Sequence, residues 1–226
     1  IDYDRQDTRN DSKAIRVGLE LNYEFDNGMK LRSLSGYQRS HLDLMFDMDG
    51  TSAPNTAIPL PGQYQPETVR EGVTTQEFNL LSPNGGNLNW VIGGTYMHRV
   101  AGALLTPTTL APDGSFITSL AIDATNPTTS FGLFGQAGYK LTPALEVQAG
   151  LRWSHDREGS TGTIAITPSP FGPGSLVIPA SAGTYSKGVF SGKVGLNWTV
   201  SPAHFIYVFG AKGYKSGGPN IGSPVG

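Results

Sequence analysis

The feature that most restricts the fold of this chain is a strict alternation of apolar and polar residues over long stretches. Residues 13–25 read KAIRVGLELNYEF, in which every second residue from Ile15 to Phe25 is apolar and those between are charged, polar or glycine. A period of two places alternate side chains on opposite faces of a β-strand, whereas a helix repeats about every 3.6 residues. The tripeptide DNG at 26–28 follows directly and favours a tight hairpin turn. The chain is therefore predicted to be all-β.

The same hairpin unit recurs along the whole chain. Tight turns begin at Asp26, Pro83, Thr142 and Ser201, which lie 57 to 59 residues apart. We predict about eight antiparallel strands in four hairpins. The strands are expected at 13–25, 29–47, 74–82, 88–96, 131–141, 145–154, 190–200 and 205–215.

Three segments between the hairpins, 50–72, 100–128 and 157–186, are rich in Pro, Thr, Ser and Gly, and we predict them to be long loops. Every proline is expected in a turn, a loop or the tail, because proline cannot donate a hydrogen bond to a sheet. The phase of the second strand is unclear around Ser33–Ser35, where a bulge would account for it.

Strands of this length, joined by short turns at one end and long loops at the other, are typical of outer-membrane β-barrels. Only 15% of the residues are charged and the mean hydropathy is −0.21, as alternating barrel strands produce. No apolar run approaches the roughly 20 residues of a transmembrane helix. Aromatic residues group at two levels, as in the two girdles of a membrane barrel. They are Tyr23, Phe25, Trp90, Tyr139, Trp198, Phe205 and Tyr207 near the short turns, and Tyr37, Tyr96 and Trp153 towards the long loops.

Two other architectures remain open at this point. A soluble β-sandwich, such as a carbohydrate-binding module, also alternates and also uses aromatic residues. A small closed outer-membrane barrel, structural or with an enzyme site at its rim, is the second. However, the first and last connections are both short, which would place both chain ends on the extracellular side, whereas a complete small barrel has both in the periplasm. We therefore expect residues 1–226 to be an internal segment of a larger barrel.

The alternation also predicts which side chains face lipid and which face the interior. Leu133, Val147, Ala149, Leu151 and Leu196 are expected to point into lipid. The opposite face should line a wet lumen. Its charged residues are Arg16, Glu20, Glu24, Glu77, Lys140, Glu146, Arg152, Lys193 and Lys212.

The sequence carries no pattern that predicts catalysis or a cofactor. There is no cysteine, and the four histidines (His41, His98, His155 and His204) lie far apart without metal-ligand spacing. GYKSGG at 213–218 lacks the spacing of a phosphate-binding loop and is interpreted as a strand end. A net charge of −2 gives no indication of nucleic-acid binding. Aromatic residues that could stack on a ligand in the loops are Phe46, Tyr64, Phe116, Phe171 and Tyr185, but no binding, catalytic or metal residue is predicted.

Three stretches resemble TonB-dependent receptors. TTQEFNLLSPNGGNLNWVIGGTYM at 74–97 is similar to the family's TQE…LSP hairpin, which continues through a glycine turn to W-x-x-G. SFGLFGQAGYKLTPALEVQAGLRWSHDRE at 130–158 resembles its LFGQ…Y-x-LT…GLRY hairpin, and YVFGAKGYKSGGPN at 207–220 resembles its FKSGG-N stretch. Tyr214 stands where the family usually has phenylalanine, and Pro219 follows the glycines.

This resemblance implies a 22-stranded barrel in a Gram-negative outer membrane, with a plug domain inside and a TonB-binding box ahead of it. The plug, the box and the C-terminal strands are expected outside these 226 residues. The implied function is energy-coupled uptake of a large scarce nutrient, most often an iron–siderophore, by a receptor that is not an enzyme. Its partners would be outer-membrane lipid, the plug, the TonB complex and the small-molecule substrate.

Overall fold

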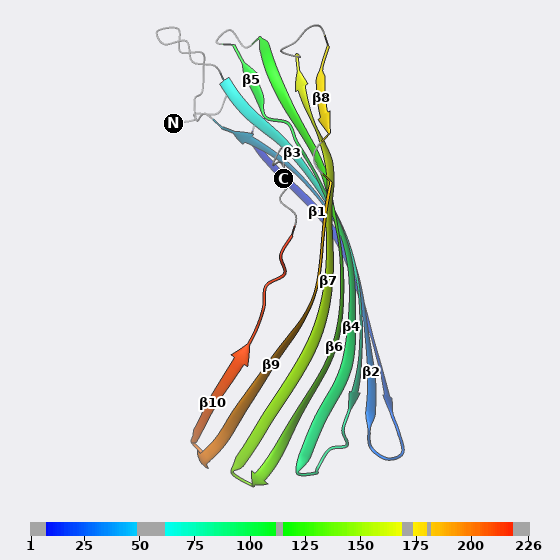
Figure 1. Ribbon diagram of the computed structural model, residues 1–226, viewed down its shortest axis with the longest axis vertical. Helices are drawn as coiled ribbons and strands as arrows, with labels where there is room; N and C mark the ends of the chain where they lie inside the picture. Colours follow the sequence, from blue (N-terminus) through cyan, green and yellow to red (C-terminus); the bar gives the residue numbers. More distant parts are fainter. Residues whose placement is uncertain (1–7, 49–61, 112–114, 169–173, 180–181, 219–226) are drawn as a thin grey trace.

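The computed structural model describes residues 8–48, 62–111, 115–168, 174–179 and 182–218, which form a single antiparallel sheet of ten strands (Figure 1). Eight strands lie side by side in the order β1–β2–β3–β4–β6–β7–β9–β10, and the short β5 and β8 are attached at one end. No helix of the described residues is long and apolar enough to cross a membrane. The strands are β1 Arg9–Glu24, β2 Lys30–Asp47, β3 Gly62–Leu81, β4 Leu88–Leu105, β5 Thr108–Leu110, β6 Phe116–Thr142, β7 Leu145–Thr167, β8 Leu176–Pro179, β9 Gly183–Ser201 and β10 His204–Lys212.

The four predicted tight turns are confirmed, and all lie at one end of the sheet, the lower end in Figure 1. We call this the turn end and the opposite end the loop end. In the first turn the Phe25 amide donates to the Met29 carbonyl at 2.9 Å and the Gly28 amide donates to the Phe25 carbonyl at 2.8 Å. Gly28 and Gly85 have φ angles of +80° and +93°, which glycine adopts without the strain that a Cβ would add.

The strands extend further towards the loop end than the sequence predicted. Most of 62–72, 100–128 and 157–186 is strand rather than long loop, so the prediction of three long loops was wrong for these residues. The physical reason is that most of these residues have a partner strand on each side, which satisfies their backbone groups. β8 and residues 183–186 of β9 pair with β7 alone among the described strands.

Three prolines lie within strands, contrary to expectation, and one of them, Pro179, is the last residue of β8 opposite Thr163. Pro66 is in β3 opposite Met45, and Pro127 is in β6 opposite Val100. The β6–β7 ladder skips from the Thr125–Thr161 pair to the Thr128–Glu158 pair, so the missing donor of Pro127 falls at a gap in the pairing. This is how a sheet can accommodate proline.

The bulge expected at Ser33–Ser35 is not present. Pairing of β2 with β1 and with β3 continues without a shift through Ser33 and Ser35. Among the described strands, the register shifts instead at Thr109/Leu110, at Lys140/Thr142 and at His204/Phe205.

The sheet is one curved layer with no second layer packed against it (Figure 1). Ala124 is the one buried hydrophobic residue among those described, so the sheet has no apolar core between layers, and a β-sandwich is excluded. β1 and β10 form the two edges and do not pair with each other, which also excludes a closed barrel of the described strands. The fold is the predicted segment of a larger antiparallel barrel wall.

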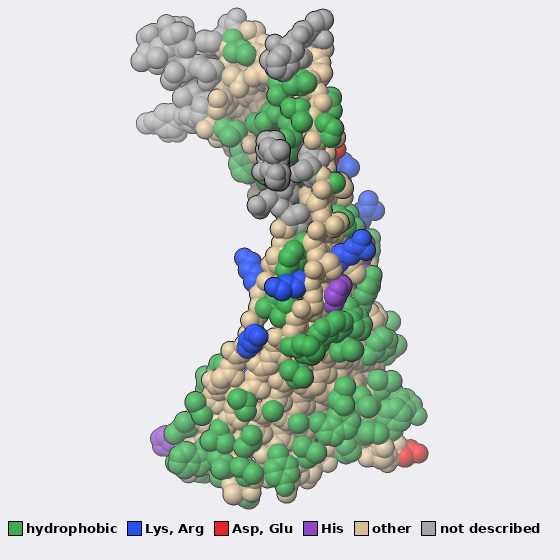
Figure 2. All heavy atoms as spheres, in the orientation of Figure 1, with side chains coloured by type: hydrophobic (Ala, Val, Ile, Leu, Met, Phe, Trp, Pro, Cys, Tyr) green, Lys and Arg blue, Asp and Glu red, His purple; other side chains and the backbone are tan. Residues whose placement is uncertain are grey.

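The convex outer face is apolar towards the turn end. Cross-strand pairs place Leu133, Val147, Ala149, Leu151 and Leu196 on this face, as predicted. Figure 2 shows hydrophobic side chains covering the lower part of the molecule, with lysine and arginine gathered near mid-height. Tyr37, Tyr96 and Trp153 share the outer face above this apolar band, and Trp153 packs edge-to-face on Phe131 at 6.0 Å. An aromatic level on the side towards the loop end is thus confirmed.

Candidate functional site

The candidate site is the concave inner face, where the strand alternation gathers the polar side chains. Direct cross-strand pairs share a face, so the register assigns each residue to one side of the sheet. Eight of the nine charged residues predicted for this face lie on it. They are Arg16, Glu20, Glu24, Glu77, Lys140, Glu146, Arg152 and Lys193.

The ninth, Lys212, was assigned to the wrong face. Ser201 pairs with His204 but Thr199 pairs with Phe205, so Val200 is an extra residue on β9. Because one extra residue reverses the alternation, Lys212 pairs with Gly192, which in turn pairs with Leu151 on the outer face.

The same bulge moves three aromatic residues of β10. Phe205, Tyr207 and Phe209 lie in register with Thr199, Asn197 and Gly195 on the inner face. The Phe205 and Tyr207 rings, and the Tyr207 and Phe209 rings, have centroids 6.2 Å apart, so they form a continuous aromatic row. The prediction that Phe205 and Tyr207 belong to the outer aromatic girdle was therefore wrong.

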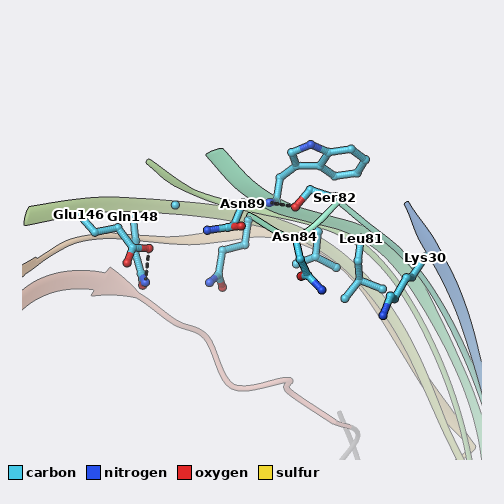
Figure 3. Close-up of a pocket in the computed structure, with 11 residues that line it drawn as sticks. Lys30, Leu81, Ser82, Asn84, Asn89, Glu146 and Gln148 are labelled. Carbon is cyan, nitrogen blue, oxygen red and sulfur yellow. Dashed lines mark hydrogen bonds between the residues drawn. The ribbon is translucent and has the colours of Figure 1, made fainter. Parts of the chain in front are cut away.

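At the turn end the inner face holds a groove of about 370 Å³, shown in Figure 3. Lys30, Leu81, Asn84, Glu146 and Gln148 extend from the same side of the sheet into this space. The Gln148 side-chain amide donates to the Glu146 carboxylate at 3.0 Å. The groove is open and combines polar side chains with apolar lining surface, which suits contact with another protein surface better than enclosure of a small molecule.

Midway along the strands, an arginine is fixed by neutral partners. Arg152 donates to the Thr95 hydroxyl at 2.8 Å and to the Ser154 hydroxyl at 3.0 Å, and its guanidinium lies 5.7 Å from the Phe134 ring centroid. Arg99 forms an ion pair with Glu71 on the same face. These contacts hold the charges in fixed positions along the inner wall.

Near the loop end, residues beyond β10 fold onto the inner face. The Tyr214 hydroxyl donates to Asp156, which also accepts a hydrogen bond from the Ser130 hydroxyl. Partial burial and the neighbouring Asp156 carboxylate raise the pKa of Tyr214, which lies beyond the last strand, to about 12. The strand predicted to continue to residue 215 ends at Lys212, and the GYKSGG stretch at 213–218 directly follows the end of this strand.

The histidines do not assemble a catalytic or metal site. His155 lies 3.2 Å from the Ser186 hydroxyl on the outer face, whereas Asp156 faces inward, so these residues cannot form one relay. His41 pairs with Asp43 at 2.8 Å, and His204 contacts Ser201 within the last turn. No group of three or more potential metal ligands occurs within the described residues.

The aromatic residues predicted for ligand contact lie mostly in strands. Phe46, Tyr64, Phe116 and Tyr185 belong to the loop-end parts of β2, β3, β6 and β9, and Phe171 lies outside the described residues. Tyr185 pairs with Glu158 and therefore faces inward, and the backbone of Gly217 packs against its ring. The sequence analysis did not predict that the strands extend over these residues. The pairing of those strands decides which face of the sheet each ring occupies.

A long, curved antiparallel sheet with an apolar outer face and a polar inner face is a wall segment of a transmembrane β-barrel. The sequence matches the family model described as TonB dependent receptor-like, beta-barrel, over residues 1–225. The chain belongs to the TonB-dependent receptor family.

Solved structures share this fold. The ferric yersiniabactin uptake receptor FyuA from Yersinia pestis superposes with a TM-score of 0.71 at 16% sequence identity, over 98% of this chain and 31% of that chain. The open form of the ferric-catecholate import receptor Fiu from E. coli gives a TM-score of 0.62 at 15% identity, over 90% of this chain and 36% of that chain. The closed form of Fiu gives 0.66 at 14% identity, over 92% and 34%. This chain therefore spans about a third of the length of these receptors, and no curated protein sequence matches it.

Proposed function

We propose that this chain forms part of the barrel wall of a receptor that imports an iron–siderophore across the outer membrane of a Gram-negative bacterium. The observation that carries the proposal is the family match over residues 1–225, combined with a sheet whose two faces suit lipid on one side and a polar interior on the other. FyuA and Fiu, named for ferric yersiniabactin uptake and ferric-catecholate import, support the class of substrate.

The inner face supports a plug domain as the partner inside the barrel. The open groove of Figure 3 lies on this face, and Lys30, Glu146 and Gln148 extend into it. A polar domain packed against this face would contact these side chains, and the TonB complex would then act on that domain from the periplasm.

Uptake measurements on the full-length receptor test the proposal. We expect a deletion strain to lose import of one radiolabelled ferric siderophore, and the intact gene to restore it only while TonB and the proton gradient are active. A panel of catecholate and hydroxamate siderophores, with cobalamin and a maltooligosaccharide as non-siderophore members, identifies the substrate. Undiminished import of every member by the deletion strain would contradict the proposed function.

The orientation in the membrane is a separate prediction. We expect the loop end to be extracellular and the turn end periplasmic, as outer-membrane barrels keep their short turns inside. Residues 1–226 contain no cysteine, so in a full-length receptor from which any other cysteine has been removed, Val177→Cys in β8 and Asn27→Cys in the first turn can be labelled selectively. A membrane-impermeant thiol reagent on intact cells should label the full-length receptor at position 177 only. Labelling at position 27 alone would reverse the orientation.

A further inference from the structure

We propose that the outer face of β2, β3 and β4 carries a binding site for the phosphorylated headgroup of an outer-leaflet glycolipid. A groove of about 450 Å³ opens on this face. We call it the outer basic groove, and it is defined by Tyr37, Arg39, His41, Arg70, Gly72 and Gly102. The inference assumes that the chain lies in an outer membrane, but it does not depend on which nutrient the receptor imports.

The strand register produces the groove. Arg39 pairs directly with Gly72, and Arg70 pairs directly with Gly102. Each arginine therefore stands opposite a residue without a side chain, and a Cβ placed on Gly72 would meet nothing within 4 Å. Because Arg39–Gly72 and His41–Arg70 are successive pairs on this face, the two arginines are diagonal neighbours, typically about 7–8 Å apart. One phosphate group can contact both from that position.

Neither arginine of the groove is paired with a carboxylate of the described residues. Glu71, which also lines the groove, is ion-paired with Arg99, and Asp11 lies opposite Asp43 on the same face. Arg39 and Arg70 are exposed, and neither side chain has an ion pair or hydrogen bond within the described part of the chain. Lys13 of β1 pairs with His41 and adds a third cation to the same row. The carboxylate nearest along β2 on this face, Asp43, is already engaged by His41 and by the Thr68 hydroxyl, each at 2.8 Å. Adjacent like charges repel, so an anion bound between the guanidiniums would be stabilising.

The position of the groove identifies the anion. Arg39 stands nine residues beyond Lys30, where β2 begins, and Arg70 eleven residues before Leu81, where β3 ends. A β-strand crosses the hydrocarbon in about 9–11 residues, so both arginines lie at its outer boundary. Tyr37, at the aromatic level, lies just below them on the same face. What meets a convex barrel wall at that level is the headgroup of an outer-leaflet lipid, and guanidinium binds phosphate oxygens in a bidentate manner.

Native mass spectrometry of the purified full-length receptor tests the site, using lipid A with two phosphates and the same lipid after enzymatic dephosphorylation. We expect the phosphorylated lipid to bind and each of Arg39→Gln and Arg70→Gln to weaken binding by roughly tenfold, the scale of one lost charge-assisted hydrogen bond. Arg157→Gln is the matched control, since Arg157 faces outward on β7, away from the groove. It should bind lipid as the unmodified receptor does. Heat-modifiable migration shows that each variant is folded.

Three outcomes would overturn the inference. Equal binding by folded Arg39→Gln, Arg70→Gln and unmodified receptor would show that the groove is not the site. Equal binding of the dephosphorylated lipid would show that phosphate is not recognised. Complete displacement of the bound lipid by millimolar inorganic phosphate would indicate that the ligand is a soluble anion. A receptor that binds the lipid but imports no siderophore would contradict the proposed function and leave this site intact.

Discussion

Gln148 and Leu151 lie three residues apart on β7 and on opposite faces of the sheet. Gln148 lines the inner groove, whereas the Leu151 side chain is 60% exposed on the outer face. An arginine at the bilayer midplane costs roughly 2–4 kcal/mol, while an arginine at position 148 meets water and the Glu146 carboxylate. We expect Leu151→Arg to reduce the amount of folded full-length receptor in the outer membrane and Gln148→Arg to leave it nearly unchanged. Quantifying heat-modifiable receptor measures this, and equal tolerance of both changes would refute the assignment of the two faces.

Gly162 shows how closely two strands can approach when a residue has no side chain. A Cβ at Gly162 would collide with the Asp123 carbonyl of β6 and lie 3.2 Å from the Ala124 Cα, and backbone atoms cannot easily move aside. A Cβ at Gly18 of β1 would meet nothing within 4 Å. We therefore expect Gly162→Ala to destabilise the full-length receptor by about 1–3 kcal/mol, as overpacking does, and Gly18→Ala to be neutral or slightly stabilising. Urea midpoints in detergent compare them, and similar midpoints would count against this close packing.

At the scale of the strands, the sequence predicts where residues alternate strictly and fails where pairing decides the conformation. The turn-end halves of the strands, such as 145–154, alternate clearly and were found where predicted. Residues 116–128 contain Asp, Asn, Pro and several Thr, and they are strand because β4 and β5 pair with them on one side and β7 on the other. Local propensity cannot supply that information, since the partner strands are distant in sequence.

The clearest example is β10, where local sequence does not predict which side chains face inward and which face outward. A single extra residue at Val200 moves Phe205, Tyr207 and Phe209 to the inner face, and nothing in the alternation of FIYVF reveals it, because both faces of this strand are apolar. The charged inner wall was predictable for the opposite reason, since its residues are separated by clearly apolar ones. The bulge therefore needs a test of its own.

We expect Val208 to face lipid and Phe209 to face the interior. Spin labels on Val208→Cys and Phe209→Cys in the full-length, reconstituted receptor can be compared by their accessibility to oxygen, which concentrates in lipid, and to a water-soluble nickel chelate. Oxygen should relax the label at position 208 more strongly, and the nickel chelate the label at position 209. The reverse pattern would mean that the register has no extra residue and that the aromatic row belongs to the outer girdle.

At the scale of the whole molecule, the two edges of the sheet determine what the chain can do alone. Every residue of β1 and of β10 is exposed, and the two strands do not pair with each other. Lipid offers no hydrogen-bond partners, so unpaired edge groups inside a bilayer cost several kcal/mol each. Eight strands could close, but such a barrel has room only for its own side chains, and a siderophore could not pass. In the receptor, both edges should therefore pair with strands that lie outside residues 1–226.

We accordingly predict that a polypeptide of residues 1–226 does not assemble into a stable membrane protein by itself. Refolded into detergent micelles, it should aggregate or remain protease-sensitive, without the heat-modifiable migration that the full-length receptor shows under the same conditions. Hydrogen exchange distinguishes the two states at the edges. In the full-length receptor the amides of 9–24 and 204–212 should be protected on both sides of each strand, because each strand has two neighbours there. A monodisperse, protease-resistant monomer of residues 1–226 with both edge strands protected would mean that β1 and β10 pair with each other in solution. The inner face would then line a narrow, side-chain-filled barrel, and uptake of a siderophore through this wall would lose its structural basis.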